Sequence, residues 1–398
     1  MKDLMATFPA GAGEQVTLAN WRTAPSCHWA FHHVREIVPT AEIANEPDNI
    51  WRLGQSPRDL SGISIDTGSG ATISFQEFLD QTDTDGLVIL HNGDSVFETY
   101  CNGMGTLDPH ILFSVSKSML GLLAGILAHR NILDIEAQIT DYVPEMARTG
   151  YAGATVRDLL DMRSGVMFVE DYMATEGPII DYRKATGWNP LDEGEQPGDL
   201  RGFYDCLTET DAEPGGPFHY ISPNTDLLGW VIERAAGARF SDLMSTHLWK
   251  PMGAERNASI TVDRLGAPRA AGGMSASVRD LARVGQLILQ DGVRDGTQVI
   301  PASWIEDLYG NGDTQAWQAG DFAPFFPDLD MHYRSKWYVL RGDAPILFGI
   351  GIHGQNLYVD PKNSVVIAKV SSRGMPLDTD QELLALRAAK AIGNHLGA

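Results

Sequence analysis

Ser114-Val115-Ser116-Lys117 stands at the head of an apolar stretch that runs to about Leu127. A serine and a lysine three residues apart lie one turn apart on the same face of a helix, so the amine can reach the hydroxyl. This helix is apolar around most of its circumference, which predicts that it is buried. The apolar residues are Met119, Leu120, Leu122, Leu123, Ile126 and Leu127. Burial disfavours the charged lysine, and a neutral lysine can accept the serine proton. The sequence therefore predicts a nucleophile, Ser114, with Lys117 as its base.

The composition is that of an ordinary globular protein, with 43% hydrophobic and 21% charged residues in 398. This length suits one large or two medium domains with an ample core. The chain carries 30 basic and 52 acidic residues, which gives a formal net charge of −22. Such a balance argues against nucleic acid or an anionic membrane as a partner.

The three cysteines, Cys27, Cys101 and Cys206, are too few and too far apart to imply a disulfide framework, and none has metal-site spacing. The first twenty residues hold no apolar run like that of a signal peptide. No window approaches the roughly 18 apolar residues needed to span a bilayer. We therefore expect a soluble, cytoplasmic protein with no metal and no cofactor.

Strand and helix signals alternate along the chain in a pattern typical of an α/β protein. Residues 86–100 read as two strands about an Asn92-Gly93 turn, and strands return between residues 336 and 370 before a closing helix at 382–396. Residues 113–270 are mainly helical, and within them the long Gly-, Pro- and acid-rich stretch 170–216 reads as a lid or binding loop. We expect an α/β domain made of residues 1–105 and 271–398, interrupted by a mainly helical domain at 106–270 that carries the serine-lysine helix and the lid.

Tyr220 is the second candidate for chemistry, in Phe218-His219-Tyr220-Ile221-Ser222-Pro223-Asn224 just before a helix. A lysine ammonium nearby could hold this tyrosine partly as phenolate. It could then act as a base toward the serine and as an acid toward the leaving group. The alternative is a packed tyrosine that precedes a helix cap.

The third candidate is the glycine-rich strand Gly349-Ile350-Gly351-Ile352 and the residues up to Asn356. Glycine inside a strand often marks close approach of a ligand to the backbone, and the alternative is a bulge. An edge strand beside the serine could donate one N–H to a developing oxyanion. The other would come from Ser114 at its helix N-terminus.

These three elements, in this order, resemble the serine β-lactamase and penicillin-binding-protein superfamily. Residues 155–160 and 272–283 also resemble helices of that superfamily. A nearer resemblance is to the 6-aminohexanoate-dimer hydrolases, the nylon-oligomer hydrolases, on Trp29-Ala30-Phe31, residues 114–118, Asn224-Thr225-Asp226 and residues 349–356. The resemblance implies a β-lactamase-like α/β fold, in which helices and a mainly helical insertion flank an antiparallel sheet.

The resemblance also implies roles for individual residues. Ser114 would be the acylated nucleophile, Lys117 its proton partner and Tyr220 the acid/base that helps to deprotonate Ser114 and protonates the leaving amine. The backbone N–H groups of Ser114 and Ile352 would form the oxyanion hole. Tyr172 resembles a lid tyrosine and Trp188 a tryptophan that lines the substrate site. A homodimer would be in keeping with the family.

Two positions depart from the superfamily pattern. Ser222 stands at the third position of the Tyr-x-Asn motif, and Gly349-Ile350-Gly351 stands where Lys-Thr-Gly is expected. The missing strand lysine helps to hold the carboxylate of a β-lactam, so its loss removes a strong charged contact.

We therefore expect a cofactor-free serine hydrolase that acts through an acyl-enzyme on a small linear amide or carboxylic ester. The alternatives are a carboxylesterase with little amidase activity and a β-lactamase or DD-peptidase. A non-enzymatic alternative is a sensor that is acylated without turnover.

Overall fold

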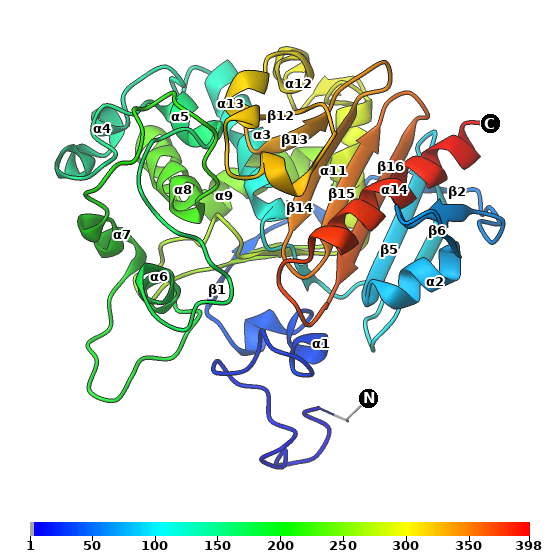
Figure 1. Cartoon of the computed structure of the whole chain (residues 1–398), viewed down its shortest axis with the longest axis horizontal. Coiled ribbons are helices and arrows are strands. Elements are labelled where there is room, and N and C mark those ends of the chain that lie inside the picture. The colour runs from blue at the N-terminus through cyan, green and yellow to red at the C-terminus, as the bar shows by residue number, and fades with distance from the viewer. Residues whose placement is uncertain (1–3) are drawn as a thin grey trace.

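An eight-stranded sheet forms the centre of the computed structural model, which describes residues 4–398 (Figure 1). Residues 1–3, which begin the expected α/β domain and the stretch searched for a signal peptide, lie outside the described part. Neighbouring strands are antiparallel except β2 and β6, which are parallel. The order across the sheet is β12 (Met331–Arg334), β13 (Trp337–Leu340), β14 (Ile346–Gly351), β15 (Gln355–Asp360), β16 (Val365–Ser371), β5 (Thr84–His91), β6 (Asp94–Tyr100) and β2 (Gly54–Gln55).

The hairpin of β5 and β6 confirms the strand pair predicted at residues 86–100. Its turn residues Asn92 and Gly93 both have positive φ, 52° and 87°. Positive φ at both central positions is typical of the tight turn that matches the twist of two antiparallel strands.

Both faces of the large sheet are buried, and alternate residues of each strand enter different cores. In β5, Val88 and Leu90 pack with α11 (Val278–Leu289) and α3 (Val115–His129), while Leu87 and Ile89 pack with α14 (Thr379–Leu396) and α2 (Phe75–Gln81). Burial on both faces explains why this strand is an unbroken apolar run. The nucleophile helix α3 thus lies in the core on one face of the sheet.

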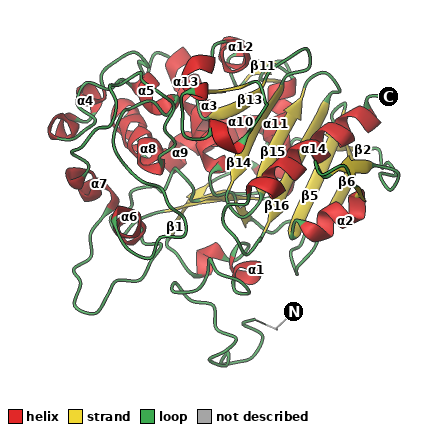
Figure 2. Ribbon diagram, viewed as in Figure 1, coloured by secondary structure: helices red, strands yellow, loops and turns green. Residues whose placement is uncertain are grey.

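A second group of helices gathers beside the sheet, on the left in Figure 2. It consists of α4 (Ile139–Tyr142), α5 (Val156–Leu160), α6 (Pro178–Ala185), α7 (Leu200–Phe203), α8 (Ser222–Ala236) and α9 (Phe240–Met244). Helix α10 (Lys250–Met252) follows in the chain and contacts α11. The remaining helices are α1 (Cys27–Ala30), α12 (Ala302–Gly310) and α13 (Thr314–Gln318). The second group falls within residues 113–270, as the helical pattern predicts.

A smaller antiparallel sheet has the order β1 (Thr40–Ile43), β8 (Ala258–Thr261), β9 (Met274–Ala276) and β7 (His110–Ile111). Strand β8 belongs to the expected helical domain, yet it pairs with β1 and β9 from outside that domain. The domain boundaries at 105 and 270 stay a prediction. Two-stranded ribbons join β3 (Ser64–Asp66) to β4 (Thr72–Ser74) and β10 (Val293–Arg294) to β11 (Thr297–Gln298).

The stretch 170–216 is not one long loop, because it contains α6 and α7. Pro178 opens α6 at a position where a missing N–H costs nothing, and Asp199 caps α7 by accepting a hydrogen bond from Gly202 N at 2.9 Å. The Gly- and Pro-rich flanks of these helices conceal them in the sequence. Among residues 4–398, no helix combines the length and the apolar character needed to cross a membrane.

Candidate active site

Ser114 is the residue that caps the N-terminus of α3, and the residue before it has an unusual backbone conformation. Phe113 has a φ of 42°, in the left-handed region that a bulky side chain rarely adopts. Such a conformation costs about 1–3 kcal/mol and persists only where the surroundings enforce it. Phe31 packs edge-on against Phe113 with a centroid distance of 4.9 Å, and Trp21 stacks on it at 6.4 Å. This aromatic packing fixes the backbone of Phe113 and therefore the position of Ser114, which follows it.

Lys117 is buried, with 1% of its surface exposed, and its Nζ lies 2.9 Å from Ser114 Oγ. The same nitrogen donates hydrogen bonds to Ser222 Oγ at 3.1 Å and to the Ala271 carbonyl at 2.7 Å. Burial lowers the pKa of Lys117 to about 7. Near neutral pH, a large fraction of this lysine is therefore a neutral amine that can accept the serine proton.

Asp226 on α8 fixes the position of the loop that carries the Ala271 carbonyl. The Asp226 carboxylate accepts a hydrogen bond from Ala271 N at 2.7 Å and one from Tyr182 Oη at 2.5 Å, and it forms an ion pair with Arg269. Because the carboxylate is fully enclosed by these partners, it fixes the loop that presents the carbonyl to Lys117.

Tyr220 lies over Lys117, whose Nζ is 4.9 Å from the centre of the phenol ring. Burial first, and then the negative charge of Glu170, raise the pKa of Tyr220, and the Ser114 hydroxyl offsets part of this rise. The phenolate expected from the sequence is therefore wrong, because desolvation and Glu170 outweigh the nearby amine. Tyr220 is a neutral phenol, suited to donate a proton rather than to accept one.

Glu170 connects the loop after Phe168 to the start of α8, and the sequence did not reveal it as a site residue. Its carboxylate accepts hydrogen bonds from Ser222 Oγ at 2.6 Å, from Ser222 N and from Tyr172 Oη at 3.0 Å. Its negative charge raises the pKa of Lys117 and so opposes the effect of burial. No local pattern in the sequence marks this glutamate, because Ser222, which connects it to the site, is 52 residues away.

Strand β14 runs past the nucleophile, but it is not an edge strand as expected. It lies third in the sheet, between β13 and β15, and its pairing with β15 is regular, without a bulge. A Cβ added at Gly351 would lie 2.6 Å from the Leu112 carbonyl, and one at Gly349 would lie 2.8 Å from Ser118 Oγ. The glycines therefore allow close packing of β14 against the nucleophile segment, and the bulge is wrong. Gly351 also lines a small pocket with Ser114 and Tyr220, so contact of a ligand with this backbone stays a prediction.

Ile352 follows β14 directly and lines the same pocket as Ser114. Trp188 also lines this pocket, is 4% exposed, and donates its indole N–H to Thr261 Oγ1 at 3.0 Å. Tyr172 borders it as well. The structure thus brings together all six residues singled out in the sequence, and the catalytic and binding roles expected of them stay predictions.

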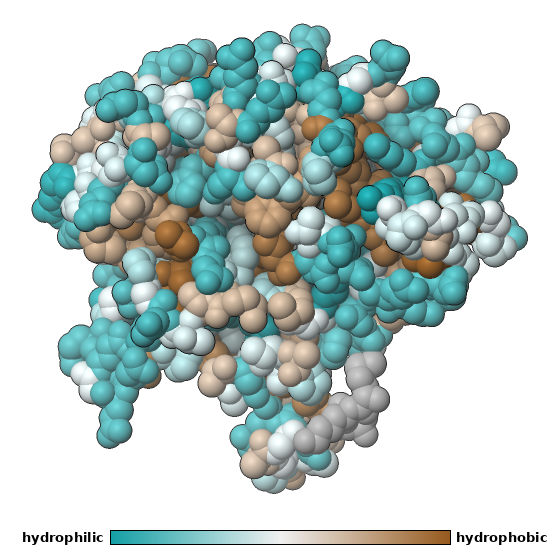
Figure 3. Space-filling view, in the orientation of Figure 1, coloured by the Kyte–Doolittle hydropathy of each residue, from teal (hydrophilic) through white to brown (hydrophobic). Residues whose placement is uncertain are grey.

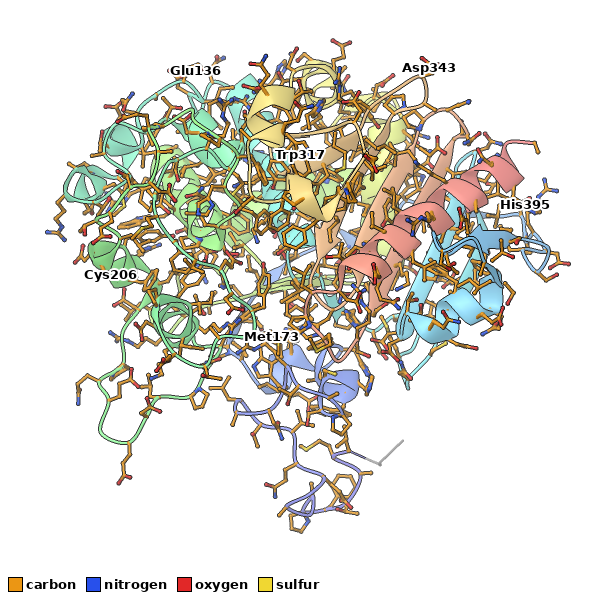
Figure 4. All side chains as sticks on the ribbon, viewed as in Figure 1. Glu136, Met173, Cys206, Trp317, Asp343 and His395 are labelled. Carbon is orange, nitrogen blue, oxygen red and sulfur yellow. The ribbon has the colours of Figure 1, made fainter. Side chains whose placement is uncertain are left out.

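Tyr220 also lines a cavity with a volume of about 500 Å³. Ser114 is not among its lining residues. Exposed apolar side chains border it, namely Val169, Met173 and Phe325. Apolar surface gathers in the middle of the face shown in Figure 3, and Figure 4 places Met173 between the helical group and the end of the large sheet.

No group of three or more His, Cys, Asp or Glu side chains within residues 4–398 is arranged to hold a metal ion. The chemistry that the site can perform rests on a serine hydroxyl, an amine whose pKa is lowered to about 7 and a phenol, all in mutual reach. These are the parts of a nucleophile with its base and its acid.

Comparisons with known proteins agree with this arrangement. Residues 74–392 match the family model described as Beta-lactamase. The chain is 35% identical over 368 residues to the 6-aminohexanoate-dimer hydrolase of Paenarthrobacter ureafaciens, a match that covers 92% of this chain and 91% of the relative.

Solved structures also resemble the fold, among them these two. One is a provisionally assigned 6-aminohexanoate-dimer hydrolase from Bacillus anthracis, 29% identical, with a TM-score of 0.86 over 96% of this chain and 97% of that one. EstCE1, a hydrolase with promiscuous acyltransferase activity, shares the fold at 16% identity, with a TM-score of 0.62 over 80% of this chain and 96% of its own.

Proposed function

The chain belongs to the Beta-lactamase family and, within it, to the 6-aminohexanoate-dimer hydrolases, and on that premise we propose that it cleaves linear amides or carboxylic esters through an acyl-enzyme on Ser114. One observation carries this proposal. The buried Lys117 amine lies 2.9 Å from Ser114 Oγ, and its pKa is lowered to about 7. A serine is a weak nucleophile unless such a base takes its proton.

In the acylation step, neutral Lys117 accepts the proton of Ser114 while Ser114 Oγ bonds to the substrate carbonyl carbon. The negative charge that develops on the carbonyl oxygen would be stabilised by the N–H groups of Ser114 and Ile352. Ser114 at the N-terminus of α3 gains further from the positive end of the helix dipole.

Collapse of this intermediate breaks the bond to the leaving group, which needs a proton. Tyr220, as a neutral phenol, donates that proton to the leaving amine or alkoxide, and the ammonium of Lys117 restores it. Water then attacks the carbonyl carbon of the acyl-enzyme and gives up a proton, which Tyr220 passes on to the neutral Lys117. Lys117 returns this proton to Ser114 Oγ as the bond between Ser114 and the acyl group breaks. The acid is released and Ser114 regains its hydroxyl.

Amide and ester cleavage are favoured over β-lactamase or DD-peptidase activity. The stretch Gly349-Ile350-Gly351 in β14 presents no lysine at the place where a β-lactam carboxylate would be held. A chromogenic cephalosporin tests that alternative. A sensor would give a stoichiometric burst with no steady-state turnover, whereas an enzyme continues to turn over.

Replacing Tyr220 by Phe tests the proton donor. An amine leaving group depends on the proton far more than p-nitrophenolate does, so we expect the amide rate to fall by about 10²–10⁴ and the ester rate by much less. The measurement compares initial rates for the N-butyl amide and the p-nitrophenyl ester of hexanoic acid.

Tyr309→Phe is the matched control, because the Tyr309 hydroxyl is buried without a hydrogen-bond partner among the described residues. We expect it to leave both rates unchanged. Equal losses on the amide and the ester in Tyr220→Phe would remove the proposed role of Tyr220.

For the cell location we propose the cytoplasm. The support is that Cys27, Cys101 and Cys206 are all unpaired in the structure, as is usual in a reducing compartment. Cell fractionation tests this proposal, and recovery of the protein in a secreted fraction would contradict it.

A further inference from the structure

Three arginines line the narrow pocket that contains Ser114: Arg22, Arg183 and Arg269. They come from distant parts of the sequence, and they meet in a chain whose formal net charge is −22. Positive side chains therefore gather in the candidate active site of a protein that is strongly negative overall.

Only one of the three arginines has a carboxylate partner. Arg269 pairs with Asp226. Within residues 4–398, neither Arg22 nor Arg183 forms an ion pair with an acidic side chain. Arg22 instead donates to the Asn189 side chain and leaves its buried Nε without a partner, and Arg183, 9% exposed, donates to the Tyr172 carbonyl at 3.2 Å.

Glu170 also lines this pocket, and its negative charge favours the charged form of Arg183, but burial outweighs it and the pKa of Arg183 is still lowered. The oxygens of Glu170 accept hydrogen bonds from Ser222 and Tyr172, and its charge also faces Lys117. Burial and the positive charges of Arg183 and Arg269 lower the pKa of Arg22 to about 9. A guanidinium perturbed in this direction would be stabilised by an anion in the pocket.

The geometry of the two pockets indicates which part of the substrate lies near these arginines. Tyr220, the proposed proton donor to the leaving group, lines the large cavity and is not among the residues that line the arginine pocket. The lining of the large cavity is mostly apolar but includes Asp171 and Asp321. Ser114 and Ile352, which would hold the carbonyl, do line the arginine pocket. The leaving group therefore points to the apolar side, and the acyl chain points to Arg22 and Arg183.

The arginine pocket is narrow, with a cavity volume of about 30 Å³. A site of about 10–15 Å³ by this measure holds one water molecule. The pocket thus fits a small terminal group, and the guanidinium fork is suited to a carboxylate, which it can bind through two parallel hydrogen bonds.

We propose that the substrate carries a carboxylate at the far end of its acyl chain, bound by Arg183 and Arg22, and an apolar leaving group. The substrate class is then the monoesters or monoamides of dicarboxylic acids. This inference rests on the proposed serine hydrolase function. It makes the 6-aminohexanoate dimer, whose acyl half ends in an ammonium group, a poorer substrate than an acid of similar length.

The test uses three p-nitrophenyl esters with six-carbon acyl chains: the monoester of adipic acid (anionic), the hexanoate (neutral) and the 6-aminohexanoate (cationic). Hydrolysis measured with Ser114→Ala is subtracted as background. For the wild-type enzyme we expect kcat/KM for the adipate ester to exceed that for the hexanoate by about tenfold or more, with the cationic ester slowest.

Arg183→Gln and Arg22→Gln should each lower kcat/KM for the adipate ester about tenfold more than they lower kcat/KM for the hexanoate ester. Arg148→Gln is the matched control, because Arg148 pairs with Asp205 on the surface. If a variant does not fold, inhibition of the wild-type enzyme gives the same information. Free adipate should then inhibit more strongly than hexanoate, and 6-aminohexanoate least.

The inference is overturned if the hexanoate ester is cleaved as well as the adipate ester and adipate inhibits no better than hexanoate. Equal effects of Arg183→Gln on all three esters would overturn it too. Failure of the underlying function looks different, since none of the esters would then be cleaved faster than by Ser114→Ala.

Discussion

Lys117 combines nearly complete burial with contacts to Ser114, Ser222 and the Ala271 carbonyl. In water a lysine amine is protonated at neutral pH and cannot act as a base. Enclosure in the protein removes the solvent that stabilises the ammonium, which is why its pKa is lowered from 10.5 to about 7. This single side chain therefore sets the pH range in which Ser114 can be activated.

The pH dependence of ester cleavage tests this role. The proton must be absent from Lys117 for it to accept one, so the active fraction grows as pH rises through the lowered pKa. We expect kcat/KM to rise through a midpoint near pH 7 and then to stay level, because the pKa of Tyr220 is raised and its phenol remains protonated. A profile measured from about pH 5 to pH 9 that is flat throughout would contradict the assignment.

Glu170 provides a second test at the residue scale, because its charge acts on Lys117 without any direct contact with the nucleophile. A nearby negative charge favours the ammonium, so Glu170→Gln should lower the pKa of Lys117 further. We expect the midpoint of the pH profile to move to lower pH. Glutamine keeps one oxygen that can accept from Ser222 Oγ and Tyr172 Oη, while the Ser222 N–H loses its acceptor.

Glu176→Gln is the control for this experiment, since Glu176 is an exposed acidic residue a few positions further along the chain. It should leave the midpoint unchanged. A fall in rate in Glu170→Gln with no movement of the midpoint would mean that Glu170 has only a structural role.

At the scale of elements, the site depends on the close approach of β14 to the segment before α3. A methyl group at Gly351 would lie 2.6 Å from the Leu112 carbonyl, a backbone atom that cannot rotate away. We expect Gly351→Ala to displace the end of β14, and with it Ile352, and to lower kcat by about 10²–10³, the usual effect of losing one oxyanion donor.

Gly310→Ala is the matched control, because a Cβ at Gly310 would meet no atom within 4 Å. It should retain full activity. Circular dichroism of both variants separates loss of geometry from loss of folding. Full activity in a folded Gly351→Ala variant would show that this close approach is not needed.

The sequence predicted those elements whose signals are local. The apolar stretch after Ser114 gave α3, and the Asn92-Gly93 pair gave the β5–β6 turn. The position of β14 inside the sheet could not be predicted in the same way, because strand order depends on partners far along the chain. Helices α6 and α7 are short and lie among Gly- and Pro-rich segments, so their periodicity was too brief to recognise.

At the scale of the whole molecule, the site gathers residues from nearly the full length of the chain, from Arg22 to Ile352. The serine-lysine pair was predictable because its members are one helical turn apart. Tyr220 and Ile352 were predicted with the help of the family resemblance. Glu170 and the arginine pair were not, because only the folded chain brings them to Ser114.

The site has two sides that differ in charge and in size. One is a narrow pocket lined by Arg22 and Arg183, which form no ion pair with a described acidic side chain, and the other is a large cavity with exposed apolar side chains at its border. Ser114 and Tyr220 are placed where these two sides meet. A substrate that spans both would have its scissile bond at the nucleophile.

The most direct test of the central claim is mass spectrometry of the protein quenched within the first turnovers of a p-nitrophenyl ester, followed by mapping of the modified peptide. The account predicts that the mass of one acyl group is added, that it is carried by Ser114, and that Ser114→Ala shows neither the added mass nor turnover. Acylation at another residue, or turnover close to that of the wild type in Ser114→Ala, would contradict it.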